Sequence, residues 1–343
     1  MNSEHRTALQ PYWDLVLANV SADAMRVAIE WDLFRHLDRP RDAADIAMQL
    51  QLDPVNTGYL LDMLWSMALL SREAGNPPRY ANQEIARRYF CSDAAQYLGD
   101  AFLFRLKGLR RVGNQLGEQV RSGMIHSPAV DARTMQENWA KAAGLQIAQE
   151  QRAVTADVVT ALMPNIPEFE SGGRLLDLGC GPGLIAIAML QACPALSGEL
   201  FDFPETVKVA QGNISQAGLS DRLKVKGGDL VIDPIGKNFD LIWCSSVLHF
   251  VPDINAILAK IWTALKPGGV LISAHAEVPL TAAEARKVLP YYLSIQMKQC
   301  HVTQKGELSL AMAASGFVHI EQYDDIAFPV APVSVIVGRK EAV

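Results

Sequence analysis

The sequence predicts an α/β protein, with a parallel, doubly wound sheet in its C-terminal half and a helical N-terminal half. The length of 343 residues corresponds to roughly two domains. Before about residue 165 the apolar residues recur at helical spacing, whereas after it short apolar strands alternate with helices. Strands that alternate with helices are typical of a parallel sheet covered by helices on both faces.

Composition narrows the class of protein. Hydrophobic residues make up 50% of the chain and charged residues 20%, which excludes a disordered chain. The net charge of -6 weighs against a dedicated nucleic-acid binder, because such proteins are usually basic. The apolar stretches are too short to span a membrane and the N-terminus lacks a signal peptide, so we expect a cytoplasmic protein. The five scattered cysteines include no C-x-x-C pair, so neither a disulfide framework nor a zinc knuckle is expected.

The N-terminal half begins with the pattern of a winged helix. Asp42 can cap a short helix over 43–50, and Asp53 followed by Pro54 is a typical N-cap and first helical residue of a second helix. A tight turn at 75–78 then separates two short segments. Helix, helix and two-stranded turn, in this order, are the outline of a winged helix.

The remaining elements follow in order along the chain. More helix is expected from about residue 94 to 163, before a linker at 164–167. The expected strands are 174–178, 199–203, 223–226, 240–245 and 270–273, and the expected helices are 184–193, 204–217 and 254–265. A turn at 266–269 ends the last of these helices, and the tail adds strands at 318–324 and 333–337.

A glycine-rich loop, D-L-G-C-G-P-G at 177–183, follows the first strand of the sheet and opens a helix. Cofactors bind at this end of a strand in such folds, but the G-x-G-x-G spacing differs from the G-x-G-x-x-G pattern of dinucleotide sites. Asp202, at the end of the second strand, can accept hydrogen bonds from both hydroxyls of a ribose, and Asp229, after the third, can receive an adenine amino group. The alternative is a tight turn with two surface aspartates.

These motifs resemble those of the class I S-adenosylmethionine (AdoMet) methyltransferases. Residues 175–183 are similar to their first motif, and 265–269 to their later L-x-P-G-G turn. Within that superfamily the chain is most similar to the plant-type, acetylserotonin-type small-molecule O-methyltransferases, including their bacterial natural-product branch. The similar segments are 29–34 together with the winged helix, which match the dimerisation domain, 201–205 and 247–249.

The resemblance implies a fold, a cofactor and a partner. The fold is a C-terminal Rossmann-like sheet with an N-terminal winged-helix dimerisation domain, divided into 1–100 for dimerisation, 101–165 for a helical substrate-covering region and 166–343 for the catalytic domain. The cofactor is AdoMet, which leaves as S-adenosylhomocysteine, without a metal, and the partner is a second copy of the chain. The cofactor-binding residues are Asp177, Gly179, Gly181, Gly183, Asp202, Phe203, Gly228, Asp229, Leu230 and Ser245.

The same resemblance implies that His249 is the general base. A neutral imidazole is free to take a proton at cellular pH; the alternative is a histidine that caps the following helix or fills the crevice. The acidic partners of the family are replaced here. Phe250 stands in place of an Asp, His275 occupies the position of one Glu, and a second Glu falls in the segment 300–303, which contains His301. Glu277 is expected to point away from the base.

Two interpretations of the missing acids remain open. The acceptor can be acidic enough (an activated phenol, an enol, a carboxylate or a thiol) to need little help from a base, which we favour. Alternatively, His249, His275 and His301 face one pocket and handle an anionic substrate. Their spacing matches no short metal-ligand motif. Side chains that can line the acceptor pocket, each of which could equally belong to the core, are Phe104, Trp139, Trp243, Tyr292 and Met297.

We therefore expect an AdoMet-dependent enzyme of secondary metabolism that O-methylates a small aromatic or conjugated metabolite. C- or S-methylation, or an AdoMet-assisted reaction without methyl transfer, is the alternative on the same fold. A winged-helix transcription regulator is the alternative of another class. The helix at 54–70 has almost no basic residue, which makes it a poor DNA reader.

Overall fold

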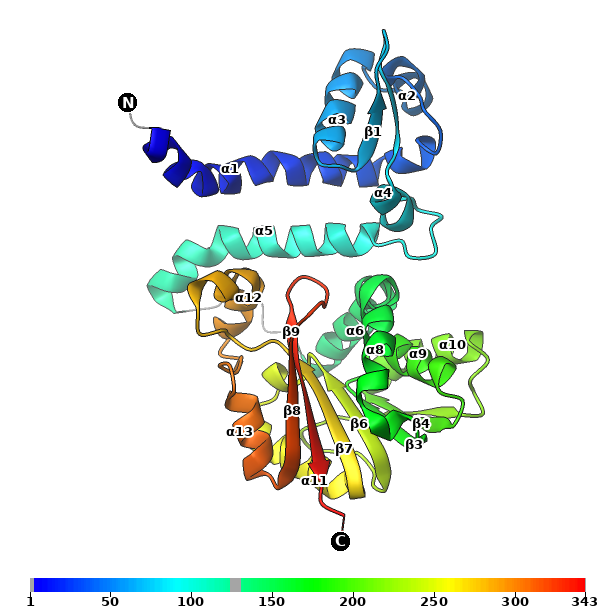
Figure 1. Ribbon diagram of the computed structural model, residues 1–343, viewed down its shortest axis with the longest axis vertical. Helices are drawn as coiled ribbons and strands as arrows, with labels where there is room; N and C mark the ends of the chain where they lie inside the picture. Colours follow the sequence, from blue (N-terminus) through cyan, green and yellow to red (C-terminus); the bar gives the residue numbers. More distant parts are fainter. Residues whose placement is uncertain (1–2, 124–130, 343) are drawn as a thin grey trace. The chain divides into compact units, whose positions relative to one another are not determined.

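The computed structural model describes residues 3–123 and 131–342 and divides into two compact units, 1–107 and 108–343 (Figure 1). The division into three regions at residues 100 and 165 stays a prediction. Each unit has its own buried core.

The first unit packs helices against a two-stranded hairpin. Its elements are α1 (Ser3–Glu30), η1 (Leu33–His36), α2 (Ala43–Leu50), α3 (Pro54–Ser66), β1 (Leu70–Glu73), β2 (Arg79–Asn82), α4 (Glu84–Tyr89) and the start of α5 (Gly99–Ser122). The two expected caps are confirmed, because Asp42 accepts a hydrogen bond from the amide of Asp45 and Asp53 accepts one from that of Asn56. The order of helix, helix and antiparallel hairpin is confirmed as well.

The helix α3 carries acidic rather than basic chemistry. Asp62 accepts a hydrogen bond from the hydroxyl of Tyr80 at 2.7 Å and forms an ion pair with Arg72 at 3.1 Å. These contacts tie α3 to the hairpin.

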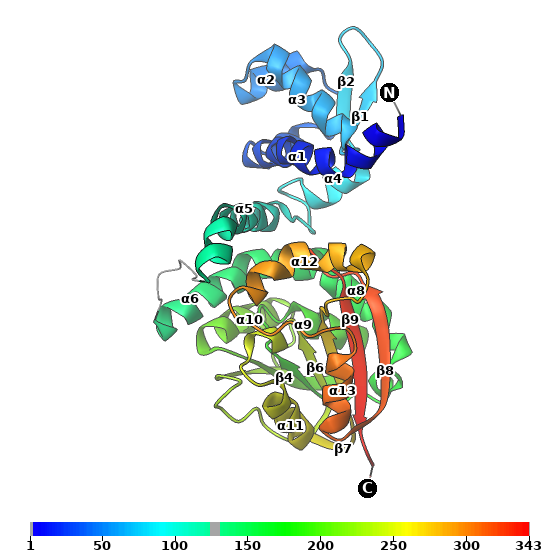
Figure 2. The ribbon, with the colours of Figure 1, turned by 90° about the vertical axis from the view of Figure 1, so that its left-hand side faces the viewer.

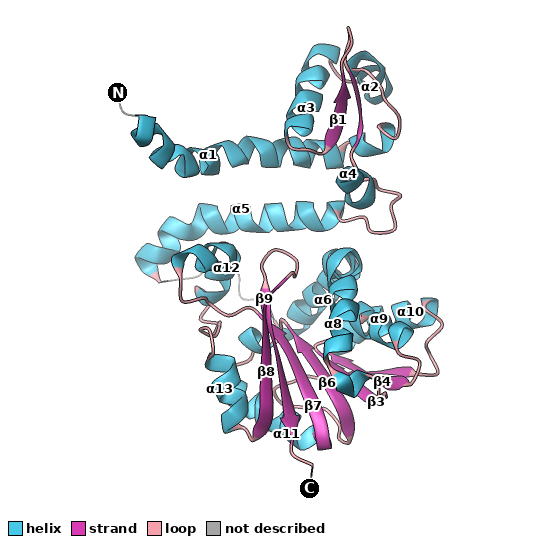
Figure 3. Cartoon of the chain, in the orientation of Figure 1, coloured by secondary structure: helices cyan, strands magenta, loops and turns pink. Residues whose placement is uncertain are grey.

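The second unit contains a seven-stranded sheet in the order β5-β4-β3-β6-β7-β9-β8 (Figure 3). The strands are β3 (Gly173–Leu178), β4 (Leu196–Asp202), β5 (Leu223–Gly227), β6 (Phe239–Ser245), β7 (Leu265–His275), β8 (Phe317–Ile326) and β9 (Val333–Lys340). The expected parallel arrangement is right for β3 to β7. The two strands of the tail, for which no direction was predicted, differ from the parallel core, since β9 pairs antiparallel with both β7 and β8. A short connection between β8 and β9 permits only an antiparallel hairpin.

The helices of this unit cover both faces of the sheet (Figure 2). They are α6 (Ala132–Ala142), α7 (Ala148–Glu150), α8 (Ala156–Leu162), α9 (Leu184–Ala192), α10 (Pro204–Gln216), α11 (Ile254–Ala264), α12 (Ala282–Gln296) and α13 (Glu307–Ala314). Successive strand residues contribute to opposite faces, so that Leu175 and Trp243 pack on one side and Leu176 and Ile242 on the other. Within residues 3–123 and 131–342, no helix combines the length and apolar character needed to cross a bilayer.

Two local features differ from the expectation. The residues 266–269 do not form a turn before the strand, because β7 begins at Leu265 and absorbs them as an irregularity in its pairing with β6. The helical region expected up to residue 163 contains π-helical turns that were not expected, at η2 (Ala143–Ile147) and η3 (Gln151–Thr155). Such turns recur at functional sites.

Candidate functional site

The glycine-rich loop between β3 and α9 depends on glycine at its two ends. Gly179 and Gly183 have φ values of 75° and 76°, in the left-handed region that side chains other than glycine rarely adopt. A Cβ at Gly179 would lie 2.2 Å from Cγ2 of Val247, and one at Gly183 would lie 2.4 Å from Cδ2 of Leu200. The loop therefore approaches β4 on one side and the segment after β6 on the other, as closely as a bare backbone allows.

Two carboxyl groups lie beside this loop. Asp177 is 2% exposed, and its Oδ2 has no hydrogen-bond partner among the described residues. Burial, with a further contribution from Asp202, raises the pKa of Asp177 to about 8. Asp202 accepts hydrogen bonds from the amides of Gly181 and Phe203 at 2.8 and 2.7 Å, and burial raises the pKa of this carboxyl as well. Because burial opposes the negative charge of both groups, the site would gain from a positively charged ligand.

The third predicted acid, Asp229, follows β5, which is the strand next to β4 in the sheet. The carboxylate of Asp229 accepts a hydrogen bond from the amide of Val231 at 2.8 Å, which shapes the turn after β5. A Cβ at Gly228 would lie 2.8 Å from the ring of Phe201, and the amide of Gly228 donates to the carbonyl of Asp202 at 2.9 Å. This hydrogen bond thus joins the ends of β4 and β5.

The predicted cofactor-binding residues accordingly follow the ends of four neighbouring strands, β5, β4, β3 and β6. Leu230 is buried after β5, Phe203 begins the segment that leads into α10, and Ser245 ends β6, where its hydroxyl accepts a hydrogen bond from the indole of Trp243 at 3.1 Å. All of them therefore lie at the carboxyl ends of these strands, which is where open α/β folds bind ligands.

His249 lies at the same edge, in η6 (Leu248–Phe250) directly after β6. It is 6% exposed and surrounded by rings, with centroid distances of 4.2 Å to Phe250, 5.5 Å to Tyr292 and 6.3 Å to His275. Trp139 of α6 packs edge-on against Phe250 at 5.2 Å. Burial lowers the pKa of His249 to about 4, so its imidazole is neutral at cellular pH. No described carboxylate pairs with it.

His275, at the end of β7, is fully engaged in hydrogen bonds. Its Nε2 accepts from the amides of both Val247 and Leu248 at 3.0 Å, and its Nδ1 lies 2.9 Å from the hydroxyl of Ser273. Burial, with a smaller effect from His249, lowers the pKa of His275 well below its usual value.

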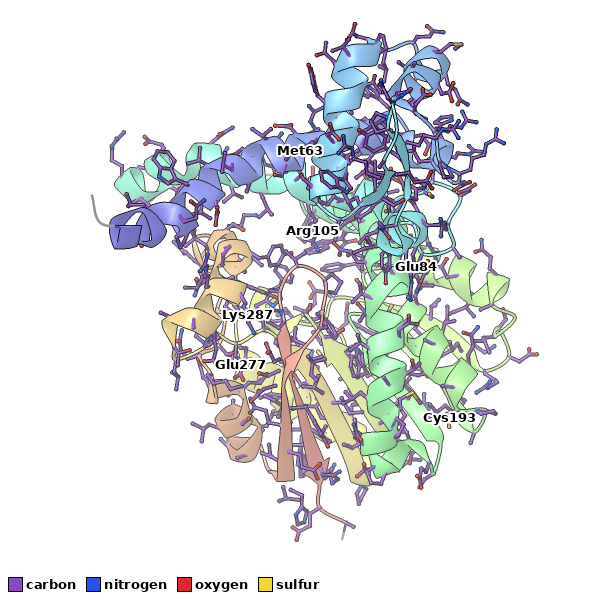
Figure 4. The ribbon with its side chains drawn as sticks, turned by 45° about the horizontal axis from the view of Figure 1, so that its top comes forward. Met63, Glu84, Arg105, Cys193, Glu277 and Lys287 are labelled. Carbon is purple, nitrogen blue, oxygen red and sulfur yellow. The ribbon has the colours of Figure 1, made fainter. Side chains whose placement is uncertain are left out.

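The structure does not bring the third predicted histidine to this pair. The side chain of His301 is 58% exposed, and its Nε2 lies 2.5 Å from the carboxylate of Glu307 at the start of α13. The interpretation in which three histidines face one pocket is therefore wrong in its third member. Glu277 (labelled in Figure 4) is also engaged elsewhere, because its carboxylate accepts hydrogen bonds from the amides of Gly306 and Leu308.

The predicted pocket residues fall into three groups. Trp139 and Tyr292 belong to the ring cluster around His249. Trp243 is 0% exposed and belongs to the core of the sheet, which corrects its assignment to the pocket surface. Met297 is half-buried at the end of α12, and Phe104 lies in the first unit, so neither is assigned to the ring cluster.

Two side chains of the site were not predicted from the sequence. Phe250 was expected only to replace an acid, yet its ring lies between those of His249 and Trp139 and contacts both. Gln151, in the second π-helical turn, accepts a hydrogen bond from the amide of Leu184 at 3.1 Å and lies beside the glycine loop. Its sequence context contains no signal for this position, because the π-helical turn that directs it arises from packing.

Other chemistries find no support among residues 3–123 and 131–342. No group of three or more His, Cys, Asp or Glu side chains is arranged to hold a metal ion there. Cys180 in the glycine loop is buried, and burial raises the pKa of its thiol, which is the opposite of what a reactive cysteine requires.

The neutral, buried histidines each make a contribution to stability that is lost in acid. The unfolded chain binds a proton at His249 near pH 6.5 and the folded chain only near pH 4, so the contribution of His249 to the free energy of unfolding falls as the pH drops through this window. The raised pKa of Asp177 acts in the opposite direction over the same window, so the effect of His249 must be measured as a difference between two proteins. At pH 5 the loss from His249 alone is about 2 kcal/mol, and His275 acts in the same direction. Thermal unfolding of the wild type and of His249→Gln at pH 7.5, 6 and 5 isolates this contribution. Measured relative to pH 7.5, the Tm at pH 5 should be higher in His249→Gln than in the wild type, and the same pH dependence in both proteins would contradict the assignment.

Comparisons with known families match both units. A family model described as a methyltransferase domain matches residues 147–322, and one described as an O-methyltransferase dimerisation domain matches residues 13–92. The first match contains the motifs at 175–183 and 265–269, and the second contains the segment 29–34.

Individual relatives agree with these matches. N,N-dimethyltransferase OxyT of Streptomyces rimosus is 27% identical over 267 residues, covering 75% of each chain. Tetracenomycin polyketide synthesis 8-O-methyl transferase TcmO of Streptomyces glaucescens is 26% identical over 262 residues, covering 75% of this chain and 76% of the relative. The solved structure of human N-acetylserotonin methyltransferase in complex with SAM has a TM-score of 0.79 at 21% identity and covers 100% of both chains. At this identity the likeness concerns the fold alone.

Proposed function

Because the chain belongs to the methyltransferase-domain family and also carries an O-methyltransferase dimerisation domain, we propose that it transfers a methyl group from AdoMet to an acidic hydroxyl of a small aromatic or conjugated metabolite. The observation that carries the proposal is the position of His249. It is a buried, neutral imidazole at the carboxyl edge of the sheet, among aromatic side chains.

The residues at the sheet edge fit AdoMet. When bound, AdoMet supplies a methyl group activated on a positively charged sulfonium. The glycine loop packs its backbone closely against β4 and against the segment after β6, at the carboxyl ends of the strands. In this proposal Asp202 accepts hydrogen bonds from the ribose, and Asp229 receives the adenine amino group. The orphaned oxygen of Asp177 and the raised pKa values of Asp177 and Asp202 also favour a cationic ligand.

The surroundings of His249 define the acceptor class. The rings of Phe250, Tyr292 and Trp139 offer an apolar, flat environment that suits a planar acceptor. A base whose conjugate acid has a pKa of about 4 takes a proton most readily from an acidic hydroxyl. No described carboxylate strengthens this base, so the chain relies on alignment and on the acidity of the acceptor itself.

Transfer to nitrogen is a second candidate, because OxyT is named an N,N-dimethyltransferase and is similar to this chain over three quarters of its length. The same neutral histidine could take the proton of an attacking amine. Transfer to carbon or sulfur, and a reaction without methyl transfer, are not favoured by any specific contact.

The test is a methylation assay with AdoMet that carries a labelled methyl group. We expect labelled product and S-adenosylhomocysteine in equal amounts, and a rate that rises along a series of phenols as their hydroxyls become more acidic. An amine series of matched size separates the second candidate. Formation of S-adenosylhomocysteine without labelled product, or labelling of amines alone, would contradict the proposal for a hydroxyl acceptor.

The proposed enzyme is a homodimer, and α1 provides the surface for it. Trp13 and Leu17, one helical turn apart, are 59% and 58% exposed, and further exposed apolar side chains flank them at Tyr12, Val16 and Val20. Contiguous exposed apolar surface of this kind marks a protein interface.

Replacing Leu17 with Asp is expected to weaken the dimer, because the change places a charge on an apolar surface that association would bury. A loss of about 2 kcal/mol is typical of a central interface position. Sedimentation of the variant over a range of concentrations measures the change. The matched control is Leu310→Asp, since Leu310 is 73% exposed on α13 of the other unit and should leave the mass unchanged. Equal effects of the two changes would argue against α1 as the interface.

A further inference from the structure

We propose that His275 is a positioning residue, which fixes the turn that carries His249 by accepting hydrogen bonds from two consecutive backbone amides and takes no part in proton transfer. This inference rests on the proposed function for its catalytic consequence. Its structural part, the tautomer and the two amide contacts, can be tested without any substrate.

The turn in question begins where β6 ends. Ser245 lies opposite Ala274 of the parallel strand β7, and the amide of Ser246 donates to the carbonyl of Ala274 at 3.1 Å. Ser246 has a φ of 55°, so the chain turns sharply there. The two amides that follow, of Val247 and Leu248, would then point into the protein without a backbone partner.

His275 satisfies both of these amides at once. Its Nε2 accepts from Val247 and from Leu248 at 3.0 Å each, and its position one residue after Ala274 on β7 places it directly beside the turn. An unsatisfied buried amide costs roughly 1–3 kcal/mol, so the loss of this acceptor would let the turn rearrange.

The hydrogen bonds also assign the proton on the ring. A nitrogen that accepts two N–H bonds carries no proton itself, so the proton of the neutral imidazole resides on Nδ1 and is donated to the hydroxyl of Ser273 at 2.9 Å. Ser273 is 0% exposed, and His275 is 3% exposed. Both ring nitrogens are therefore occupied inside the protein, and neither can receive a proton that His249 takes from an acceptor.

The position of this turn determines the position of the proposed base, because His249 is the second residue after Val247. A displacement of about 1 Å in a catalytic group can lower the rate by roughly 100-fold. The amide of Leu248 immediately precedes His249, so the bond to His275 fixes the backbone from which the base projects. Val247 also contacts the glycine loop at Gly179, which joins the same turn to the cofactor side of the site.

The experiment compares two variants in the full-length protein. His275→Gln keeps an acceptor oxygen at the reach of Nε2, whereas His275→Leu removes it at similar size. With the best phenol from the labelled-methyl assay, we expect His275→Leu to lower kcat by about 30- to 100-fold with the acceptor KM within about threefold. His275→Gln should restore kcat to within about fivefold of the wild type, with the same pH profile. Equal losses in the two variants, or loss of one limb of the profile, would overturn the proposal.

Two further measurements do not depend on catalytic activity. The first is nitrogen NMR of the histidine-labelled wild-type protein, in which the signal of His275 is identified by its absence from His275→Gln. This signal should be that of a neutral imidazole protonated at Nδ1. Protonation at Nε2 would overturn the proposal, and this result does not depend on whether His275→Leu folds. Hydrogen exchange at Val247 and Leu248 should be slow in the wild type and in His275→Gln. If the protein methylates no acceptor, the proposed function fails while these two measurements still decide the role of His275.

Discussion

Replacing His249 with Asn is expected to lower kcat by about 100-fold or more for a weakly acidic phenol, with AdoMet affinity changed by less than about threefold. His249 is the neutral, buried imidazole at the carboxyl edge of the sheet, and among the described residues no carboxylate assists it. Asparagine is similar in size but accepts no proton, so the change removes proton transfer and leaves the ring cluster largely in place. The loss should shrink as the acceptor becomes more acidic, because such a hydroxyl ionises without help.

The matched control is His319→Asn, since His319 is an exposed histidine on β8. Steady-state rates with labelled AdoMet, together with calorimetric titration of AdoMet, separate the chemical step from cofactor binding. A kcat for His249→Asn within about threefold of the wild type for every phenol would show that His249 is not the base, since general-base catalysis is typically worth 10²–10⁴-fold.

Much of the second unit could be predicted because its signals are local. The strands of the parallel core are short apolar runs that end in turn residues, and Asp253 caps α11 through the amide of Ala256 as its sequence indicates. The antiparallel tail followed only from packing, because the pattern of β9 does not say that it inserts between β7 and β8. The π-helical turns were not predicted either, because no residue type in these segments signals the i→i+5 hydrogen bonds that define them.

The candidate site, too, could be predicted from the sequence only in part. The glycine loop, Asp202 and Asp229 follow three neighbouring strands, so their order along the chain already placed them at one edge. The histidines could not be sorted by spacing, because their roles depend on what each ring contacts. His275 faces the turn after β6, whereas His301 is exposed beside Glu307. That distinction is made by strand register and by the position of α13.

Replacing Gly183 with Ala is expected to weaken AdoMet binding by at least about tenfold and to lower the Tm. Gly183 has a φ of 76° at the start of α9, and a Cβ there would lie 2.4 Å from Cδ2 of Leu200 and 3.2 Å from Cβ of Ala210. Both neighbours are 0% exposed, so neither can move aside freely. The left-handed conformation alone costs roughly 1–2 kcal/mol for a residue with a side chain, and relief of this strain must move the loop that would hold the cofactor.

The matched control for this change is Gly212→Ala in α10, where a Cβ would meet nothing within 4 Å. The same substitution in a helix interior should raise stability by about 0.5–1 kcal/mol and leave AdoMet binding unchanged. Calorimetry with AdoMet and thermal unfolding of both variants provide the comparison. If Gly183→Ala loses stability but binds AdoMet like the wild type, the loop serves only to join β3 to α9. If binding is weakened beyond what the loss of stability explains, the backbone of the loop itself forms the cofactor site, because the same added methyl group in α10 meets no neighbour and requires no left-handed backbone.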